Sequence, residues 1–223
     1  MLIPKILFEN RDFIIVYKPH GLNTDQDKQG NPSLESWLSS YYQRKIFLAH
    51  RLDRPVSGLL LATKKKSILQ FIQENWKNFQ KKYYALVEGN IHPDESLLSH
   101  YHYKDLKNFK AIIDSESRKN FQICSLKYQK VKESSDFSWI EVELITGKYH
   151  QIRAQLAYIG HPIVGDQLYG SRFLLKNPFP KIALSAYHLS FYYPNKNDAF
   201  QFEYLPDDEI WNLSKLFKNL NLS

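Results

Sequence analysis

The amino-acid sequence predicts an α+β protein with a mixed, mainly antiparallel β-sheet core and flanking helices. Segments rich in β-branched and aromatic residues outnumber the segments with helical periodicity. Most connections between these segments are short, and the chain shows no internal repeat, no low-complexity tract and no linker. We therefore expect residues 1–223 to form a single domain.

The first elements are a strand and a capped helix. The strand is expected over residues 12–19, where β-branched and aromatic residues end at a proline, and a long polar loop follows over 20–32. Ser33 is a typical N-cap, and it predicts a helix over 34–43.

A second strand and helix follow. The apolar run 59–63 is short enough to be a buried strand. Ser67 is expected to cap the next helix, whose apolar residues recur at helical spacing. We expect this stripe to belong to the core; it consists of Ile68, Leu69, Ile72, Trp76 and Phe79.

The middle of the chain predicts three more strands. One is expected over 81–89, and two antiparallel strands over 121–131 and 138–146 are joined by the polar turn 132–136. The segment 100–120 is basic and weakly patterned, so we expect it to be an excursion over the surface.

The last third combines helices and strands. A helix is expected over 149–160, ending at a glycine, and two late strands over 182–194 and 199–205. The segment 206–217 predicts a capped C-terminal helix.

Composition restricts the class of protein. A hydrophobic content of 43% supports a real core, and a formal charge of +7 suits a polyanionic partner as well as a merely basic surface. No uncharged apolar run approaches the roughly 20 residues that a membrane-spanning helix needs, so we expect no membrane association. Charges interrupt the N-terminus where a signal peptide would be apolar, and the single cysteine, Cys124, cannot form an internal disulfide. We expect a cytoplasmic protein.

Two segments, 50–57 and 146–170, combine charged residues with nearby glycines. Five of the eight glycines lie in or beside them, which is typical of tight turns or close backbone approach: Gly58, Gly147, Gly160, Gly165 and Gly170. The first segment places Asp53 between Arg51 and Arg54, and the second places His150 and Arg153 three residues apart on a predicted helix. A surface turn whose charges pair with each other would explain the first segment equally well.

Three motifs in order resemble those of the RluA family of pseudouridine synthases, which convert a uridine in RNA into its C-glycoside isomer. "HRLDRPVSGLLL" resembles the motif of the catalytic aspartate, and this assigns that role to Asp53. "KKYYALVEG" resembles the second motif and assigns its tyrosine to Tyr83, while "TGKYHQIRAQLAYIGHPIVGDQLYG" assigns the arginine of the third motif to Arg153. The resemblance extends from about residue 6 to residue 206 and implies the pseudouridine synthase fold.

The chemistry of these residue types agrees with the implied roles. Uridine isomerisation breaks the N-glycosidic bond, turns the base and joins C5 to the ribose, so it requires no cofactor and no metal ion. A carboxylate such as Asp53 can act as the nucleophile if it stays ionised. Arg153 would favour that state by direct charge pairing, and Tyr83 could stack on the base and assist proton removal.

The resemblance also implies RNA contacts. A stacked uridine must be extruded before it reacts, and Arg51 is expected to fill part of the space that the base leaves. Arg54 is expected to contact a phosphate or a neighbouring loop, and His50 suits packing as well as RNA binding. The remaining expected contacts are His150, Gln151, Lys64, Lys65, Lys66 and Lys148, the last of which stands where the family usually has arginine.

The expected partner is RNA. "AHRLDRP" is similar to the branch of the family that acts on tRNA, so tRNA is favoured over rRNA. We expect no N-terminal S4-type RNA-binding domain, since there is no room for one before residue 6, and we expect a monomer.

Two other classes of protein remain as alternatives. A catalytically silent RNA-binding protein would need the basic surface but not Asp53, Tyr83 and Arg153 together. A carboxylate-based hydrolase should show a second acid poised for proton transfer. Asp166 is the only acid in the third motif, and it is expected to cap backbone amides in a turn.

Overall fold

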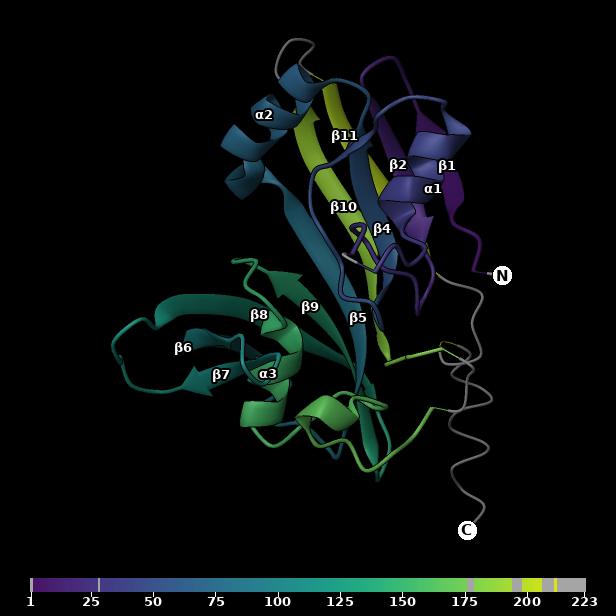
Figure 1. Ribbon diagram of the computed structural model, residues 1–223. Coiled ribbons are helices and arrows are strands. Elements are labelled where there is room, and N and C mark those ends of the chain that lie inside the picture. Colours follow the sequence, from purple (N-terminus) through teal and green to yellow (C-terminus); the bar gives the residue numbers. More distant parts are fainter. Residues whose placement is uncertain (1, 28, 176–178, 194–197, 206–210, 212–223) are drawn as a thin grey trace. The chain divides into compact units, whose positions relative to one another are not determined.

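The structure, a computed structural model, describes residues 2–27, 29–175, 179–193, 198–205 and 211 (Figure 1). The chain divides into two compact units, where the sequence predicted one domain. The first unit comprises Met1–Lys81 and Lys176–Tyr204, and the second comprises Lys82–Leu175 and Leu205–Ser223. That the two units form a single catalytic domain stays a prediction.

The first unit contains a mixed set of strands in the order β1-β2-β4-β10, with β3 paired to β4 and β11 to β10. Only β4 and β10 pair in parallel among these strands. The strands are β1 (Lys5–Glu9), β2 (Phe13–Lys18), β3 (Phe47–Leu48), β4 (Ser57–Thr63), β10 (Leu184–Tyr193) and β11 (Asp198–Glu203).

Helix α1 (Leu34–Tyr41) confirms the predicted cap. Ser33 has an extended backbone, its hydroxyl oxygen accepts from the Ser36 amide at 3.1 Å, and its own amide donates to the Ser36 hydroxyl at 3.1 Å. Leu34 and Leu38 are buried on the inner side of the helix.

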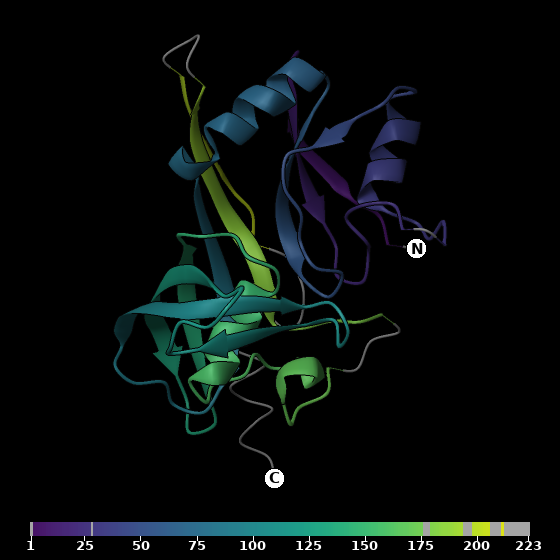
Figure 2. The ribbon, with the colours of Figure 1, turned by 60° about the vertical axis from the view of Figure 1, so that its left-hand side comes forward.

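Helix α2 (Lys66–Glu74) packs against β3 and β4 (Figure 2), and it begins and ends earlier than predicted. Lys65 has the extended backbone of the N-cap, so Ser67 lies inside the helix and the prediction of its cap was wrong. The Asn75 side chain donates to the Phe71 carbonyl at 2.9 Å and competes with helix continuation. The predicted apolar stripe nevertheless reaches the core, because Phe79 stacks on Phe191 at 4.7 Å.

The second unit is an antiparallel sheet in the order β5-β9-β8-β6-β7. Helix α3 (Gln151–Tyr158) packs against β6 and β7 (Figure 1). The strands are β5 (Gln80–Glu88), β6 (Glu95–Asp105), β7 (Lys110–Asp114), β8 (Gln122–Glu133) and β9 (Phe137–Leu144). The predicted antiparallel pair around the turn 132–136 is confirmed as β8 and β9.

The prediction of a surface excursion over 100–120 was wrong, because most of this segment belongs to the sheet. Its first residues complete β6, and β7 pairs antiparallel with β6 to form a hairpin. On β7, Ala111 and Ile113 are buried while Ile112 between them is 42% exposed. This alternation was masked in the sequence by the surrounding lysines and by the shortness of the strand.

Helix α3 begins at Gln151 rather than at 149. His150 is its N-cap residue and adopts a left-handed backbone with φ 50° and ψ 25°. The spacing had suggested that His150 and Arg153 share one helical face. They do not, because His150 lies outside the regular helix. The predicted C-terminal helix over 206–217 falls outside the described residues, apart from position 211.

We expect Gly58→Ala to destabilise the first unit strongly. Gly58 has φ +128°, and a Cβ atom there would lie 2.3 Å from the carbonyl oxygen of Ala186, its partner across the β4–β10 pair. Backbone atoms in a sheet cannot move aside, so the free energy of unfolding should fall by at least about 2 kcal/mol in a urea titration.

Gly147→Ala is the matched control for this change. An added Cβ at Gly147 meets nothing within 4 Å, and the residue needs no left-handed backbone. Its free energy of unfolding should stay within about 0.5 kcal/mol of wild type. Equal effects of the two substitutions would contradict the close approach at Gly58.

Candidate active site

Asp53 lies on the loop between β3 and β4. Its two neighbours in the chain, Leu52 and Arg54, are hydrogen-bonded to the loop that follows β2. The Thr24 hydroxyl donates to the Leu52 carbonyl at 2.6 Å and accepts from the Leu52 amide at 3.2 Å. On the other side, the Gly21 amide donates to the Arg54 carbonyl at 2.7 Å. The long polar loop predicted over 20–32 therefore fixes the backbone that carries Asp53.

The two arginines beside Asp53 contact this same loop. Arg51 forms an ion pair with Asp25 at 2.9 Å, and its side chain is 71% exposed. Arg54 donates through Nε to the Gly21 carbonyl at 3.0 Å, which is the neighbouring-loop contact considered for it. Both arginines are exposed residues.

Lys18 is a buried cation that sequence reasoning missed. Its ammonium donates to the carbonyls of Leu22 at 2.9 Å and Pro19 at 3.1 Å. Burial lowers the pKa of Lys18 to about 7, and the negative charge of Asp53 opposes that shift. Its signal in the sequence was a lysine inside an otherwise apolar strand, directly before a proline.

The stability of the protein should depend on pH through Lys18. Its pKa is lower in the folded state than in the unfolded state, so the unfolded chain binds more protons between about pH 7 and pH 10.5. The free energy of unfolding should therefore rise with pH in this window. Urea titrations at pH 7 and pH 9 should show wild type gaining about 2 kcal/mol relative to Lys18→Met. Parallel pH profiles of the two proteins would contradict this assignment.

Tyr83 lies in β5 opposite Val142 of β9 and is 6% exposed. The next residue, Tyr84, points to the other face of the strand and packs edge-on against Trp139 with ring centroids 5.2 Å apart. The two tyrosines therefore have different surroundings, and the assignment of the family role to Tyr83 stays a prediction.

Arg153 lies in α3 and forms a buried bidentate ion pair with Asp166. Arg153 Nε donates to Asp166 Oδ2 at 2.7 Å and Nη2 donates to Oδ1 at 2.9 Å, with side chains 5% and 2% exposed. The Tyr169 ring centroid lies 5.1 Å from the guanidinium carbon. The expectation that Asp166 caps backbone amides was wrong, because its carboxylate faces the guanidinium and makes no cap bond.

Two of the expected RNA contacts have structural roles. His50 Nε2 accepts from the Leu61 amide at 3.1 Å, and burial, followed by the charge of Lys81, lowers the pKa of His50 to about 3. Gln151 is 3% exposed and uses its whole amide, donating to Ser125 and Gln155 and accepting from Thr146 and Lys148.

The other expected contacts are at least partly exposed. Lys148 donates to the Gln122 side chain at 2.7 Å, and His150 bonds to the Tyr169 hydroxyl at 3.0 Å. Lys64 and Lys65 form ion pairs with Glu9 and Asp12, both at 3.2 Å, and Lys66 is an exposed residue at the start of α2.

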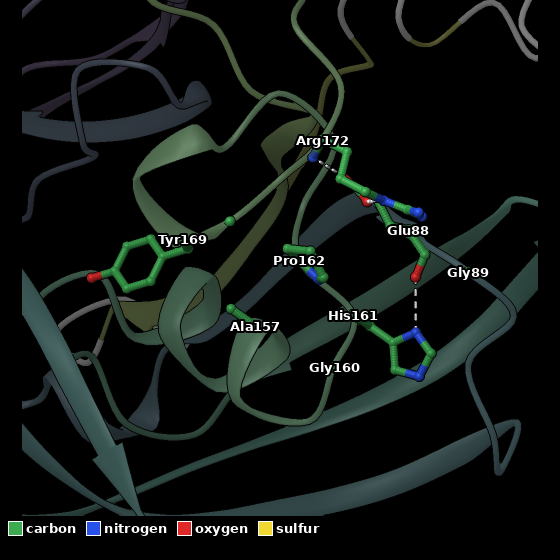
Figure 3. A pocket seen from close by; sticks show the side chains of 9 residues that line it. Glu88, Gly89, Ala157, Gly160, His161, Pro162, Tyr169 and Arg172 are labelled. Carbon is green, nitrogen blue, oxygen red and sulfur yellow. Dashed lines mark hydrogen bonds and ion pairs between the residues drawn. The ribbon is translucent and has the colours of Figure 1, made fainter.

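The second unit also contains a hollow of about 400 Å³ beside the end of α3 (Figure 3). Arg172 Nε donates to the Glu88 carboxylate at 3.0 Å, and His161 Nδ1 donates to the Glu88 carbonyl at 2.8 Å. Tyr169 also borders the hollow, and its ring points away from Glu88 and Arg172 (Figure 3). The described residues that line it do not include Asp53, Tyr83 or Arg153.

The described part of the chain contains neither a cluster of metal-ligating side chains nor a membrane-spanning helix. No three His, Cys, Asp or Glu side chains there lie close enough to hold a metal ion. None of the helices in those ranges has the length and apolar character needed to cross a bilayer.

Comparison with known proteins identifies the family. A family model described as RNA pseudouridylate synthase matches residues 12–158. Ribosomal large subunit pseudouridine synthase C of Buchnera aphidicola subsp. Baizongia pistaciae (strain Bp) is 32% identical, with 86% of this chain and 63% of that protein covered. The uncharacterized RNA pseudouridine synthase YlyB of Bacillus subtilis (strain 168) is 31% identical, with 96% and 73% covered.

A solved structure shares the fold. Human RNA Pseudouridylate Synthase Domain Containing 1 superposes with a TM-score of 0.77 at 21% identity, over 100% of this chain and 96% of that one. The predicted α+β class is confirmed, and the fold is that of a pseudouridine synthase. The chain belongs to the RNA pseudouridylate synthase family, and the resemblance to its RluA-type members is confirmed. It spans 63% of the length of the Buchnera enzyme.

Proposed function

We propose that this chain isomerises a specific uridine in structured RNA to pseudouridine, with Asp53 as the nucleophile. The observation that carries the proposal is the position of Asp53. It lies in the segment that resembles the family's catalytic motif, and its loop is fixed on both sides by hydrogen bonds from the loop after β2. A carboxylate held in this way can meet a substrate atom without reorganising its own backbone.

The proposed reaction consumes nothing. The bond from ribose C1′ to N1 of uracil breaks, the base turns, and a bond from C1′ to C5 forms. C5 loses a proton and N1 gains one, so the overall mass is unchanged. Asp53 assists the cleavage as nucleophile, Tyr83 stacks on the base and assists removal of the proton, and Arg153 favours the charged form of Asp53. No cofactor takes part in these steps.

Base flipping is the proposed entry to this reaction. Extruding a stacked uridine costs a few kcal/mol. Arg51 supports the proposal because its side chain is 71% exposed and its ion pair with Asp25 is at the surface, where it is readily exchanged for RNA. We propose that Arg51 fills part of the gap that the base leaves.

The proposed substrate is tRNA, supported by the similarity of "AHRLDRP" to the tRNA-acting branch. A second candidate is ribosomal RNA, because the Buchnera relative is named for the large ribosomal subunit. We further propose that the protein acts as a monomer in the cytoplasm.

The experiment is to incubate the pure protein with unmodified tRNA transcripts and, separately, with large-subunit rRNA fragments. Reverse-transcription mapping after carbodiimide treatment then locates pseudouridine in each. Modification of one tRNA position supports the proposal, and modification of rRNA alone favours the second candidate. Binding without modification would indicate a silent RNA-binding protein, and release of free uracil would indicate a hydrolase.

We expect RNA affinity to depend steeply on salt, with log K falling linearly against log salt concentration. Three full phosphate contacts would contribute roughly 2 to the slope. Lys64 and Lys65 are already paired with acids, so replacing Lys64, Lys65 and Lys66 with Ala should flatten the slope by only about 1. A slope that does not change in filter-binding titrations would exclude this basic run from the interface.

Arg51→Ala should behave differently from the triple lysine variant, because Arg51 is proposed to act after the RNA has bound, when the base leaves the stack. The salt slope should stay nearly unchanged while the single-turnover rate falls. Unstacking the uridine costs less free energy in a single-stranded oligonucleotide. This substrate should therefore restore the rate of Arg51→Ala more than the rate of Asp53→Asn. An equal response of both variants to duplex and single-stranded substrates would remove Arg51 from the flipping step.

A further inference from the structure

We infer that Asp166 is a positioning residue that sets the orientation of the Arg153 guanidinium for the reaction. The inference rests on the proposed function, because it concerns how Arg153 acts in that chemistry. It assigns a role in positioning to the one acid of the third motif, which its sequence context had indicated to be a turn residue.

The bidentate geometry fixes the plane and the rotation of the guanidinium. A guanidinium has five N–H donors in a rigid fork, and Asp166 accepts from Nε at 2.7 Å and from Nη2 at 2.9 Å. Both contacts lie on one edge of the fork. The Nη1 donors and the second Nη2 donor therefore point away from Asp166, in directions that the pair determines.

Asp166 can impose this orientation because its own backbone is held in a compact turn. Its amide donates to the Ile163 carbonyl at 2.9 Å, and its carbonyl accepts from the amides of Tyr169 at 3.0 Å and Ser171 at 3.1 Å. Gly170 closes the turn with a left-handed backbone at φ +92°. The carboxylate therefore has a defined position relative to α3.

The Arg153 guanidinium lies over the ring of Tyr169. The ring centroid lies 5.1 Å from the Arg153 guanidinium carbon, and the ring points away from the Glu88–Arg172 pair (Figure 3). The Tyr169 hydroxyl accepts from the Ala111 amide of β7 at 2.7 Å. The ring is thus tied to the sheet at its far end, and it limits tilting of the guanidinium out of the plane set by Asp166.

A purely structural role explains the pair poorly. Buried ion pairs often stabilise a protein no better than apolar side chains of similar size, because both charges lose hydration. Their advantage is directional, since a planar fork and a carboxylate fit in few orientations. An arginine that must present donors at fixed angles to a reacting group is the case in which this advantage matters.

The test compares Asp166→Asn with Glu88→Gln. Asn keeps the shape of Asp166 but puts an amide NH₂ against the fork, so Arg153 should lose its fixed orientation. Glu88 is the matched control, because it is also buried in the second unit, 4% exposed, and also pairs with an arginine, Arg172. Both substitutions remove one buried carboxylate charge from an arginine, which is 5% exposed in the case of Arg153 and 79% exposed in the case of Arg172.

We expect Asp166→Asn to lower the single-turnover rate at saturating RNA by about 100-fold, with the RNA Kd changed less than threefold. Glu88→Gln should leave both constants near wild type, even if its melting temperature falls. Rates are measured well below each variant's melting temperature, so that every protein compared is folded in the assay. Wild-type turnover by Asp166→Asn, or the same loss in Glu88→Gln, would overturn the inference.

A second readout is independent of activity. The Arg153 Nε–H signal in ¹⁵N NMR should be sharp and protected from solvent exchange in wild type and in Glu88→Gln, and broadened or unprotected in Asp166→Asn. An unchanged signal in Asp166→Asn would overturn the inference whatever the activity. Absence of pseudouridine in the wild-type assay would contradict the proposed function alone, because the NMR comparison would still decide the orientation of Arg153.

Discussion

Replacing Asp53 with asparagine should abolish pseudouridine formation, with a loss of more than about a thousandfold in the single-turnover rate, equivalent to roughly 4 kcal/mol. The amide has the shape of the carboxylate but lacks the charge that makes a nucleophile. RNA affinity should stay within a few fold of wild type, because phosphate contacts by other residues supply it.

The fold should tolerate this substitution. The hydrogen bonds that fix the loop involve the backbone of Leu52 and Arg54, so they survive the change at Asp53. The melting temperature should therefore stay within a few degrees of wild type, or rise if relief of burial dominates. Asp136→Asn is the control, because it removes one charge from an exposed turn between β8 and β9. Turnover by Asp53→Asn within tenfold of wild type would show that Asp53 is not the nucleophile.

Arg153→Met should lose almost all activity, whereas Arg153→Lys should keep part of it. Lysine keeps the positive charge but cannot form the bidentate contact with Asp166. Methionine removes the charge and leaves the Asp166 carboxylate buried without its cation, which costs about 3–5 kcal/mol of stability. Circular dichroism melts therefore accompany the single-turnover assays.

A double substitution separates stability from catalysis in this experiment. Arg153→Met combined with Asp166→Leu removes the unpaired buried charge, so its melting temperature should exceed that of Arg153→Met. Its activity should remain as low, because the cation is still missing. Recovery of activity along with stability, or equal activity of the Met and Lys variants, would rule out a catalytic role for the Arg153 charge.

Local signals in the sequence predicted much of the fold. Ser33 begins α1 because a hydroxyl there satisfies an amide of the first helical turn, and that requirement can be read from the chain alone. Gly58 marks a close approach of two strands, as the selective use of glycine suggested. The turn between β8 and β9 followed from a polar cluster between two apolar segments.

The wrong predictions concern β7 and the start of α2, where residue type alone does not determine the structure. Strand β7 is five residues long and carries a lysine at its start, so its burial depends on α3, which lies far along the chain. Ser67 carries a typical cap side chain, yet α2 begins at Lys66 because the preceding backbone is already extended at Lys65. The burial of β7 depends on a distant helix, and the start of α2 depends on a backbone conformation that residue type alone does not reveal.

The candidate site shows the same division. The resemblance to the family located Asp53, Tyr83 and Arg153, but no local pattern shows that Arg153 pairs with Asp166, 13 residues further on. Lys18 was missed for a related reason, since a lysine is usually exposed and its burial depends on carbonyls of the following loop. Asp53 belongs to the first unit and Tyr83 and Arg153 to the second, so their convergence stays a prediction.

The most direct test of the account is a quantitative nucleoside analysis of one unmodified tRNA transcript carrying the mapped target uridine. The transcript is incubated to completion with wild type or with Asp53→Asn, digested, and analysed by liquid chromatography and mass spectrometry. Wild type should convert one uridine per molecule into a nucleoside of equal mass and different retention, with no uracil released, and Asp53→Asn should convert none. Equal conversion by the two proteins, or release of uracil in place of the isomer, would contradict Asp53-dependent isomerisation.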